Sequence, residues 1–577
     1  MPNAEVLKVA ALRLRAPDWR DAAAMLLVLS VLVLVGIGGR QAIAPLAMGH
    51  QPAISLSPAA LPLYALRTTL RMLAALAASL LFTLTYATLA AKSRRAEMVL
   101  IPLLDVLQSV PILGYLSFTV VFFLSLFPGR MLGAELAAIF AVFTSQAWNM
   151  AFSFYQSLRT LPTDLDESAR GFRFSGWQRF WRLEAPFAVP GLVWNMMMSM
   201  SGGWFFVVAA EAISVGDVQI TLPGVGSYVA LAIQRRDLGA VGWAILAMTA
   251  TILAYDQLMF RPLVVWAEKF RYEQSASQVF PKSLVYDLFD RAGVVKRLFA
   301  PLGTRLSYVA RARLALPVRL PAWPARRAAS RWIDLGWLGL VAAVVGLGSW
   351  VLLRREASVL SLSDVEIVVA NGGLTLLRVV ILIILASLVW VPIGVVVGLN
   401  PKLAEKVQPA AQFLAAFPAN LLFPVAVFLV VRFHAEPKIW LTPLMILGTQ
   451  WYILFNVVAG ASAFPTDFRE AAASFRIHGW RWWRDVMLPG IFPYYVTGAI
   501  TASGGAWNAS IVSEVVSWGP TRLNGSGLGA YVAEMTAKGD FPRIILGVAV
   551  MSAMVIAMNR LLWRPLYALA ERRTRLD

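Results

Sequence analysis

The sequence predicts an all-α polytopic membrane protein with about twelve transmembrane helices, divided into two homologous six-helix halves. The first observation is composition: of the 577 residues, 59% are hydrophobic and 14% are charged, whereas soluble chains have roughly 45–50% and about 25%. The second is that apolar stretches long enough to cross a bilayer recur along the whole chain. The third is a polar segment that occurs once in each half.

Each apolar stretch of about 18 residues or more marks an expected span, because about 20 helical residues cross the hydrocarbon core. The first six lie near 22–39, 61–91, 98–127, 134–158, 186–213 and 241–267. The second six lie near 333–353, 372–399, 405–431, 439–461, 489–516 and 543–567.

Charge predicts the orientation of these spans. Basic residues occur before the first span, after the second span and in the C-terminal tail, namely Lys8, Arg13, Arg15, Arg20, Lys92, Arg94, Arg95, Arg572, Arg573 and Arg575. The connection 41–60 has no charged residue. Since basic loops stay in the cytoplasm, we expect both ends of the chain to be cytoplasmic.

The segment 268–332 separates the halves, which we place at 1–267 and 333–577. It contains thirteen Lys or Arg residues and four acidic residues, and "LVYDLFDRAGVVKRLF" within it is typical of an amphipathic helix. We interpret it as a basic cytoplasmic linker that lies on anionic lipid headgroups. A regulatory docking site is the alternative.

An internal repeat relates the two halves. Residues 162–190 align with 465–493 at an offset of 303 without a gap. The same offset pairs Glu211 with Glu514, and an offset of 307 pairs Arg71 with Arg378 further upstream. Unrelated segments would not align by chance at one constant offset over about a hundred residues. We therefore expect two halves in the same orientation, related by an axis along the membrane normal.

The repeated polar segments form a first loop (162–186) and a second loop (465–489). Each is expected to form a short amphipathic helix, a turn and a re-entry into the bilayer. Asp164 and Asp467 are predicted N-caps, with Glu167 and Glu470 completing capping boxes. Gly176 and Gly479 are predicted to end these helices. The alternative is that the two glutamates only cap helices.

The two loops resemble a known family. The pattern E-S-A…P from Glu167 to Pro186, and E-A-A…L-P from Glu470 to Pro489, is similar to the cytoplasmic E-A-A loop of ABC importer permeases. The segments "AAEAISVG…LPGVGSYV" and "VSEVVSWG…GSGLGAYV" resemble nitrate/sulfonate/taurine/bicarbonate-type permeases. The chain thus looks like a fused permease with the type I ABC importer-like fold. It departs where that family usually has Gly, because Arg173 and Arg476 stand there.

The resemblance implies that the loops are coupling helices that dock in a groove of the ATPase subunit. The residues this assigns to ATPase coupling are Asp164, Glu167, Ala169, Arg173, Gly176, Asp467, Glu470, Ala472, Arg476 and Gly479. The implied partners are two copies of a cytoplasmic ABC ATPase, a periplasmic or lipid-anchored solute-binding protein and membrane lipid, but no nucleic acid. The implied location is a bacterial inner membrane, and the implied solute is a small anion.

No G-x-x-x-x-G-K-[ST] phosphate loop occurs in the sequence. We therefore expect this chain to be no enzyme and to bind no cofactor, with ATP and Mg bound by partner ATPases. An ion-gradient-driven secondary transporter with parallel repeats is the alternative, since it also requires no phosphate loop. A structural scaffold would leave the repeated loops unexplained.

Polar and aromatic residues that recur in equivalent spans are candidates for the translocation path. They are Gln146, Trp148, Asn149, Trp194, Asn195, Trp204, Gln450, Trp451, Asn456, Trp507, Asn508 and Ser510. Interhelical hydrogen bonding and packing is the alternative for each of them. Arg71 and Arg378 lie inside spans, where an unpaired charge costs at least a few kcal/mol. We expect them to pair with Glu211 and Glu514, although attraction of an anionic solute is a second interpretation.

Overall fold

The structure, a computed structural model, describes residues 19–42, 54–215, 218–270, 283–312, 360–464 and 466–566, with a few single positions elsewhere. Within these ranges the chain consists of helices and two short antiparallel hairpins. The predicted all-α fold class is confirmed. The predicted charge clusters at the two chain ends lie outside the described residues, except for Arg20.

The first half contains α2 (Trp19–Ala42), η2 (Pro58–Ala60), α3 (Leu61–Lys92), α4 (Arg94–Ser109), α5 (Ile112–Leu126), α6 (Met131–Arg159), α7 (Thr163–Gly171), α8 (Gly176–Arg179), η3 (Phe180–Glu184), α9 (Ala185–Glu211), β1 (Ala212–Val215), β2 (Val218–Thr221), α10 (Val225–Gln234), α11 (Leu238–Tyr255), η4 (Asp256–Phe260), α12 (Arg261–Ala267) and η5 (Glu268–Phe270). The central segment contributes α13 (Leu284–Arg291) and α14 (Gly293–Arg311).

The second half contains α16 (Leu362–Leu399), α17 (Pro401–Ala416), η6 (Ala419–Leu422), α18 (Phe423–Arg432), α19 (Pro437–Trp440), η7 (Thr442–Met445), α20 (Trp451–Ser462), α21 (Thr466–Ser474), α22 (Trp480–Trp482), η8 (Trp483–Met487), α23 (Leu488–Ser513), β3 (Val515–Trp518), β4 (Thr521–Asn524), α24 (Leu528–Lys538), α25 (Phe541–Met558) and η9 (Asn559–Trp563).

The element bounds repeat at the offsets read from the sequence. Helices α3 and α4 end 307 residues before α16 and α17. Helix α9, strand β1 and helix α11 begin 303 residues before α23, β3 and α25. The π-helical turns η3 and η4 recur as η8 and η9 at the same offset. The homology of the halves therefore extends to local irregularities of their helices.

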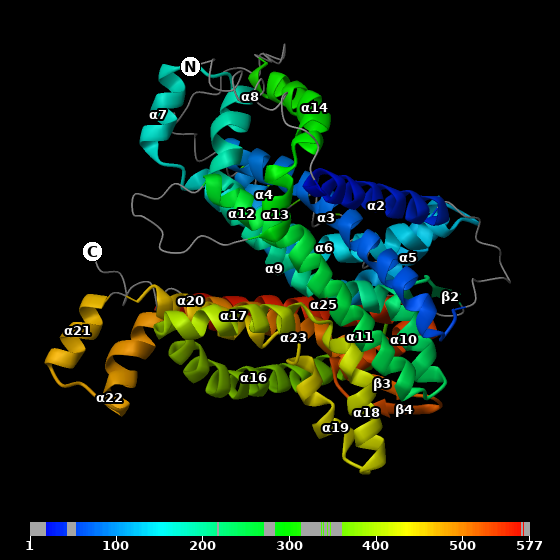
Figure 1. Cartoon of the computed structure of the whole chain (residues 1–577). Helices are drawn as coiled ribbons and strands as arrows, with labels where there is room; N and C mark the ends of the chain where they lie inside the picture. The colour runs from blue at the N-terminus through cyan, green and yellow to red at the C-terminus, as the bar shows by residue number, and fades with distance from the viewer. Residues whose placement is uncertain are drawn as a thin grey trace.

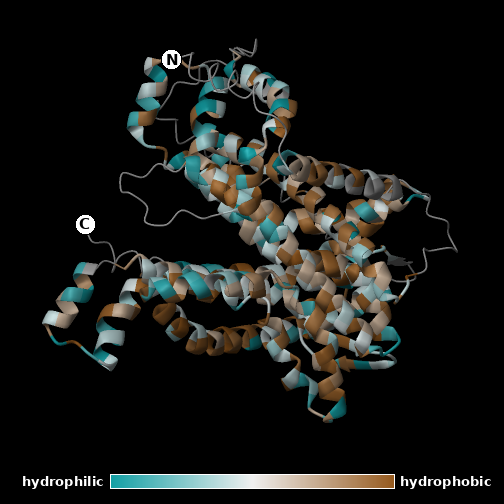
Figure 2. Cartoon of the chain, viewed as in Figure 1, coloured by the Kyte–Doolittle hydropathy of each residue, from teal (hydrophilic) through white to brown (hydrophobic). Residues whose placement is uncertain are grey.

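The halves share one orientation. Helices α3, α6 and α9 pack together in the first half, and α16, α20 and α23 pack together in the second. Figure 1 shows α7–α8 and α21–α22 projecting at one end of the molecule, while the hairpins β1–β2 and β3–β4 lie at the other end. Figure 2 shows mostly apolar long helices, with polar residues gathered on the projecting loop helices.

The two hydrophobic cores exchange elements. Ile112, Leu113 and Leu116 of α5 are buried in the core that is otherwise formed mainly by the second half. In return, Leu421 of η6 is buried in the core of the first half, and Phe413 of α17 packs against it. The halves are therefore interleaved. Burial of this apolar surface stabilises the contact between them.

Three expected spans are not single straight helices. The third and ninth spans bend by 101° between α4 and α5 and by 76° between α17 and α18. Val110 (ψ 125°) and Phe417 (ψ 127°) leave the helical region there, because each precedes a proline that disfavours it. The prediction of a single tenth helix over 439–461 is wrong. This segment divides into α19, η7 and α20, with Pro443 inside the break.

Among the described residues, six helices are long and apolar enough to cross a membrane, or eight if each bent pair forms one span. The seventh expected span, 333–353, lies outside the described residues apart from single positions. The first lies within the 24-residue α2, whereas the eleventh, 489–516, continues past the end of α23 into β3. The total of about twelve stays a prediction.

Candidate functional site

The first and second loops present matching exposed surfaces. Asp164 and Glu167 are exposed on α7, and Asp467 and Glu470 are exposed on α21. The predicted coupling residues Arg173, Gly176, Arg476 and Gly479 are exposed as well. By contrast, Ala169 and Ala472 are 3% and 4% exposed. These two alanines pack beneath their helices and contribute no surface for docking.

The predicted caps of the loop helices are wrong. Helix α7 begins at Thr163 after Pro162, so Asp164 lies in its first turn and no side chain caps its N-terminus. An acidic residue there still interacts favourably with the helix dipole. The capping box occurs later, where the Ser175 hydroxyl accepts from the Gln178 N–H. Gly176 therefore begins α8 instead of ending α7. In the second loop, α21 begins at Thr466, so Asp467 lies in its first turn, and Gly479 precedes α22 instead of ending α21.

Arg173 and Arg476 adopt the left-handed conformation, with φ of 50° and 52°. This conformation favours glycine, because a side chain there crowds the backbone. The two arginines stand where the resemblance described above predicts glycine, the residue that this conformation favours. A non-glycine residue in this conformation costs about 1–3 kcal/mol.

Sequence reasoning missed an exposed aromatic residue at the tip of each loop. Phe172 is 73% exposed and Phe475 is 79% exposed. They are equivalent at the offset of 303, and this identity within the repeat was the available signal. Exposed large apolar side chains at matching positions are typical of protein-binding surfaces.

A chain of ion pairs holds the first loop. Arg179 lies 2.8 Å from Asp166 and 2.9 Å from Glu184, and Glu184 lies 2.9 Å from Lys92 at the end of α3. At the equivalent positions the second half has Trp482, Arg469, Met487 and Leu399. The second loop therefore lacks the residues that form this chain, and the two loops are held differently.

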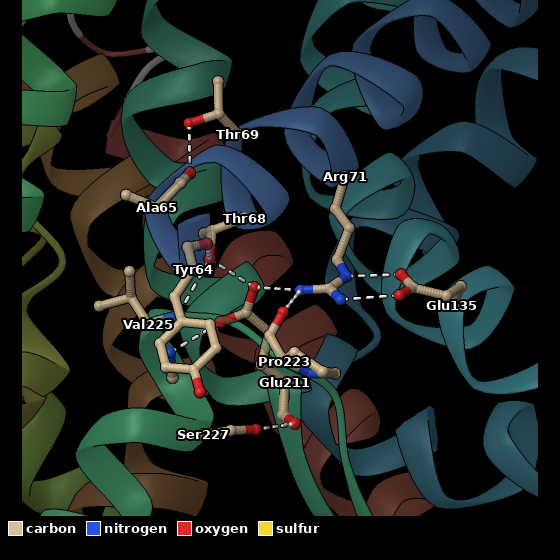
Figure 3. Close-up of polar contacts among 11 residues, drawn as sticks. Tyr64, Ala65, Thr68, Thr69, Arg71, Glu135, Glu211, Pro223, Val225 and Ser227 are labelled. Atoms are coloured by element: carbon tan, nitrogen blue, oxygen red, sulfur yellow. Dashed lines mark hydrogen bonds and ion pairs between the residues drawn. The ribbon is translucent and has the colours of Figure 1, made fainter. Parts of the chain in front are cut away.

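Arg71 is the centre of a buried ionic cluster at the hairpin end of the first half (Figure 3). Its Nη1 donates to Glu211 Oε1 at 2.6 Å, and its Nε and Nη2 donate to Glu135 at 2.5 and 2.7 Å. Thr68 Oγ1 and the Gly226 N–H also donate to Glu211. The structure thus joins the predicted pair and adds Glu135, which sequence reasoning missed.

The second half forms a simpler cluster. Arg378 Nη1 donates to Glu514 Oε1 at 3.2 Å, and the remaining acceptors of Arg378 are the backbone carbonyls of Ser526, Gly525 and Lys438. Lys438 is the residue equivalent to Glu135. Arg71 therefore makes three contacts with carboxylates and Arg378 makes one.

Both bent helices open onto one cavity of about 240 Å³ between the halves. Ile112 and Ala419, the first residues after the bends, are equivalent and both line it. Further equivalent pairs on its wall are Ser145/Gly448, Asn149/Tyr452, Gly202/Gly505 and Phe205/Asn508. Because both halves contribute the same positions, this central cavity lies on the pseudo-two-fold axis.

Hydrogen bonds join each bend to the opposite half. The Ile112 N–H donates to Asn508 Oδ1 at 2.7 Å. Asn420 Nδ2 donates to the Phe205 carbonyl at 3.0 Å. A movement of one half against the other must therefore change contacts at the wall of the central cavity.

The wall of the central cavity is mostly apolar and is uncharged, since none of its described residues is Asp, Glu, Lys, Arg or His. Five of its buried polar atoms have no hydrogen-bond partner among the described protein atoms: Trp148 Nε1, Ser199 Oγ, Thr449 Oγ1, Trp507 Nε1 and Trp563 Nε1. Three of these are indole N–H groups, which only donate. All five atoms are buried within the wall, and the polar groups of the lining residues are neutral.

The predicted path residues divide between cavity walls and helix contacts. Trp148, Asn149, Trp507 and Asn508 line the central cavity. Trp194 and Trp204 line a second cavity of about 720 Å³, formed by α9, α11, η4, α12 and α17. The others make contacts between or within helices: Gln146 with Met200, Asn195 with Ser153, Gln450 with Trp390, Trp451 with Trp390, Asn456 with Tyr452 and Ser510 with Trp507.

Two segments of the chain match one protein family, whose description is "Binding-protein-dependent transport system inner membrane component". The matches cover residues 83–260 and 390–575. Each match contains one loop, one complete bent helix pair and one hairpin.

Curated relatives agree with this match. The bicarbonate transport system permease protein CmpB of Synechococcus elongatus is 27% identical over 176 residues, which are 30% of this chain and 60% of that protein. The nitrate import permease protein NrtB of Leptolyngbya laminosa is 23% identical over 187 residues, 32% of this chain and 63% of that protein. A "Probable ABC transporter permease protein" of Brucella melitensis is 24% identical over 248 residues, 40% of this chain and 95% of that protein. The chain thus spans about 60% of the length of the first of these relatives.

Proposed function

Because the chain belongs to the family of binding-protein-dependent transport system inner membrane components, we propose that both halves together form the solute pathway of an ATP-driven ABC importer. The observation that carries this proposal is the pair of equivalent exposed loops at one end of the molecule (Figure 1). Each loop would dock one cytoplasmic ATPase subunit. In this proposal, those partners bind ATP and Mg, because the sequence has no G-x-x-x-x-G-K-[ST] phosphate loop.

Phe172 and Phe475 are the anchors we assign to this docking, because each projects from its loop beside an exposed arginine. Aromatic residues and Arg are enriched in protein interfaces. When ATP closes the two ATPases, the loops move together. The bends and cross-half hydrogen bonds at the central cavity then change, which switches the cavity between the two sides of the membrane.

The solute we propose is a small anion that passes through the central cavity. Its uncharged lining includes the partly exposed polar residues Asn149, Ser201 and Thr501. Helices α5 and η6–α18 begin at the cavity, so the positive ends of their dipoles face it. Two of the relatives carry bicarbonate and nitrate in their names. Neutral donors hold an anion without the tight ion pair that would slow its release.

The orientation follows from the same proposal. The loop end and both chain ends are cytoplasmic, and the hairpin end faces a periplasmic or lipid-anchored solute-binding protein. A proton-driven transporter commonly uses an intramembrane carboxylate as a relay. Glu211 and Glu514, the carboxylates shared by both halves, are each bound to an arginine, which favours the ATP-driven proposal.

The test is co-purification of the ATPase with single variants of the chain. We expect Phe172→Ala, Phe475→Ala, Glu167→Lys and Glu470→Lys to reach the membrane but to retain less ATPase. Arg522→Glu is the matched control, because Arg522 is exposed on β4 at the hairpin end. Full association and normal uptake in all four loop variants would refute the docking assignment.

A further inference from the structure

Helices α13 and α14 are attached to the N-terminal end of α2. Ala24 of α2 packs against Ala292 and Val295, and all three are buried. Asp21 Oδ1 accepts a hydrogen bond of 2.7 Å from the Val294 N–H. This carboxylate satisfies one of the unpaired N–H groups at the start of α14 and complements its dipole. The start of α14 is therefore fixed to the first helix of the chain.

Beyond Val295, α14 is largely exposed. Leu298 is 59% exposed, Phe299 is 44% exposed and Tyr308 is 78% exposed. The helix also carries four basic residues and no acidic residue, namely Lys296, Arg297, Arg305 and Arg311. Uncovered apolar side chains beside basic ones are typical of a helix that lies in the membrane interface on anionic headgroups.

The C-terminal end of α14 is bound by the first loop. The Val309 carbonyl accepts from Trp177 Nε1 at 2.8 Å, and the Arg311 carbonyl accepts from Gln178 Nε2 at 2.7 Å. These carbonyls belong to the last turn, where the usual i+4 partners are missing. The Val309 carbonyl also accepts from the Ala312 N–H at the C-cap, at 3.2 Å. In Figure 1, α14 lies beside α8, and its other end is close to α2.

The second loop has no equivalent contact in the described part of the chain. Trp480, the counterpart of Trp177, is 72% exposed. Arg481, the counterpart of Gln178, is exposed as well. Helix α14 thus connects the start of α2 with one of the two loops only.

We propose that α14 is an interfacial helix that binds anionic lipid headgroups, and that this binding positions the first loop but not the second. We assign lipid binding to α14 only from its exposed apolar side chains and its basic residues. The effect on transport rests on the proposed function of the loops. The basic charge of α14 complements anionic lipid, which is therefore the partner we propose. The experiment must distinguish lipid from the neighbouring ATPase subunit, which could bind the same surface.

The first experiment measures the environment of α14 in the full chain. Because the sequence has no cysteine, Leu298→Cys carries a single polarity-sensitive fluorophore, and Phe475→Cys is the matched control on the second loop. In nanodiscs with 30% phosphatidylglycerol we expect a blue shift at position 298 relative to pure phosphatidylcholine, and no shift at 475. Arg305→Gln should weaken the binding of α14 to anionic lipid about fivefold, because each basic residue near an anionic membrane surface raises the affinity by about that factor. Equal spectra in both lipids, or a shift that appears only when ATPase is added, would overturn the proposal.

The second experiment measures ATPase activity of the assembled transporter in the same nanodiscs. We expect the ratio of activities with and without phosphatidylglycerol to fall towards one in Trp177→Phe, which keeps the ring but loses the hydrogen bond to Val309. Gln178→Ala should act in the same direction. Trp480→Phe should keep the wild-type ratio, whatever its basal rate. If both first-loop variants keep the wild-type ratio of activities, lipid binding by α14 does not act through the first loop. Failure of the ATPase to bind at all would contradict the proposed function and leave the spectroscopic result intact.

Discussion

Replacement of Arg71 tests how the buried clusters stabilise the two halves. Arg71→Met leaves Glu135 and Glu211 without their shared cation, and both are largely buried. Removal of one partner from a buried ion pair costs about 3–5 kcal/mol, because the other charge stays buried and unpaired. Since two carboxylates are affected, we expect a loss of about 5 kcal/mol. Arg378→Met leaves one carboxylate, so its loss should be about 3 kcal/mol.

The measurement is the free energy of unfolding in detergent micelles, from equilibrium titration with a denaturing detergent. Glu135→Gln in the Arg71→Met background should recover about 1–3 kcal/mol, because it removes one of the unpaired charges. Arg71→Lys should remain impaired, since an ammonium group does not reproduce the two-point contact with Glu135. Equal losses for Arg71→Met and Arg378→Met, or no recovery in the double variant, would refute this account of the asymmetry.

Three further predictions concern the loops, the hairpin and the linker. Arg173→Gly should relieve left-handed strain and stabilise the first loop by about 1 kcal/mol in hydrogen exchange, whereas Arg173→Glu should reduce ATPase co-purification; equal binding by both would show that this side chain is not in the contact. Gly226→Ala should destabilise by about 1–3 kcal/mol, because its Cβ would lie 2.1 Å from the Val208 carbonyl oxygen, while Gly242→Ala, with open space around it, should not. Separate chains 1–312 and 313–577 should still assemble and transport, because the interleaved cores hold them together; assembly without transport would assign the intact linker a role beyond attachment.

The repeat made most of the architecture predictable. A fixed offset is a property of the chain alone, so the equivalence of the halves, the position of both loops and the pairing of Arg71 with Glu211 follow from it. The bends at Pro111 and Pro418 had a local signal as well, since both prolines occupy equivalent positions. They were missed because the apolar run continues through each bend, and hydropathy does not report backbone direction.

Features that break the repeat were not predictable from it. Glu135 aligns with Lys438, so it has no counterpart to mark it as half of an ion pair. The same is true of the ion-pair chain through Arg179 and of the contact between Trp177 and α14. The exchange of α5 and η6 between the cores depends on the bend angles, which are set by packing after the chain has turned.

The most direct test of the central claim is uptake by the reconstituted chain, measured with radiolabelled bicarbonate and nitrate in proteoliposomes. We expect uphill uptake only when the ATPase subunit, ATP and Mg are supplied together, with the binding protein on the hairpin side. The chain alone should show no ATP hydrolysis and no uphill uptake. Uptake driven by a proton or sodium gradient, without nucleotide or ATPase, would contradict the account and support a secondary transporter.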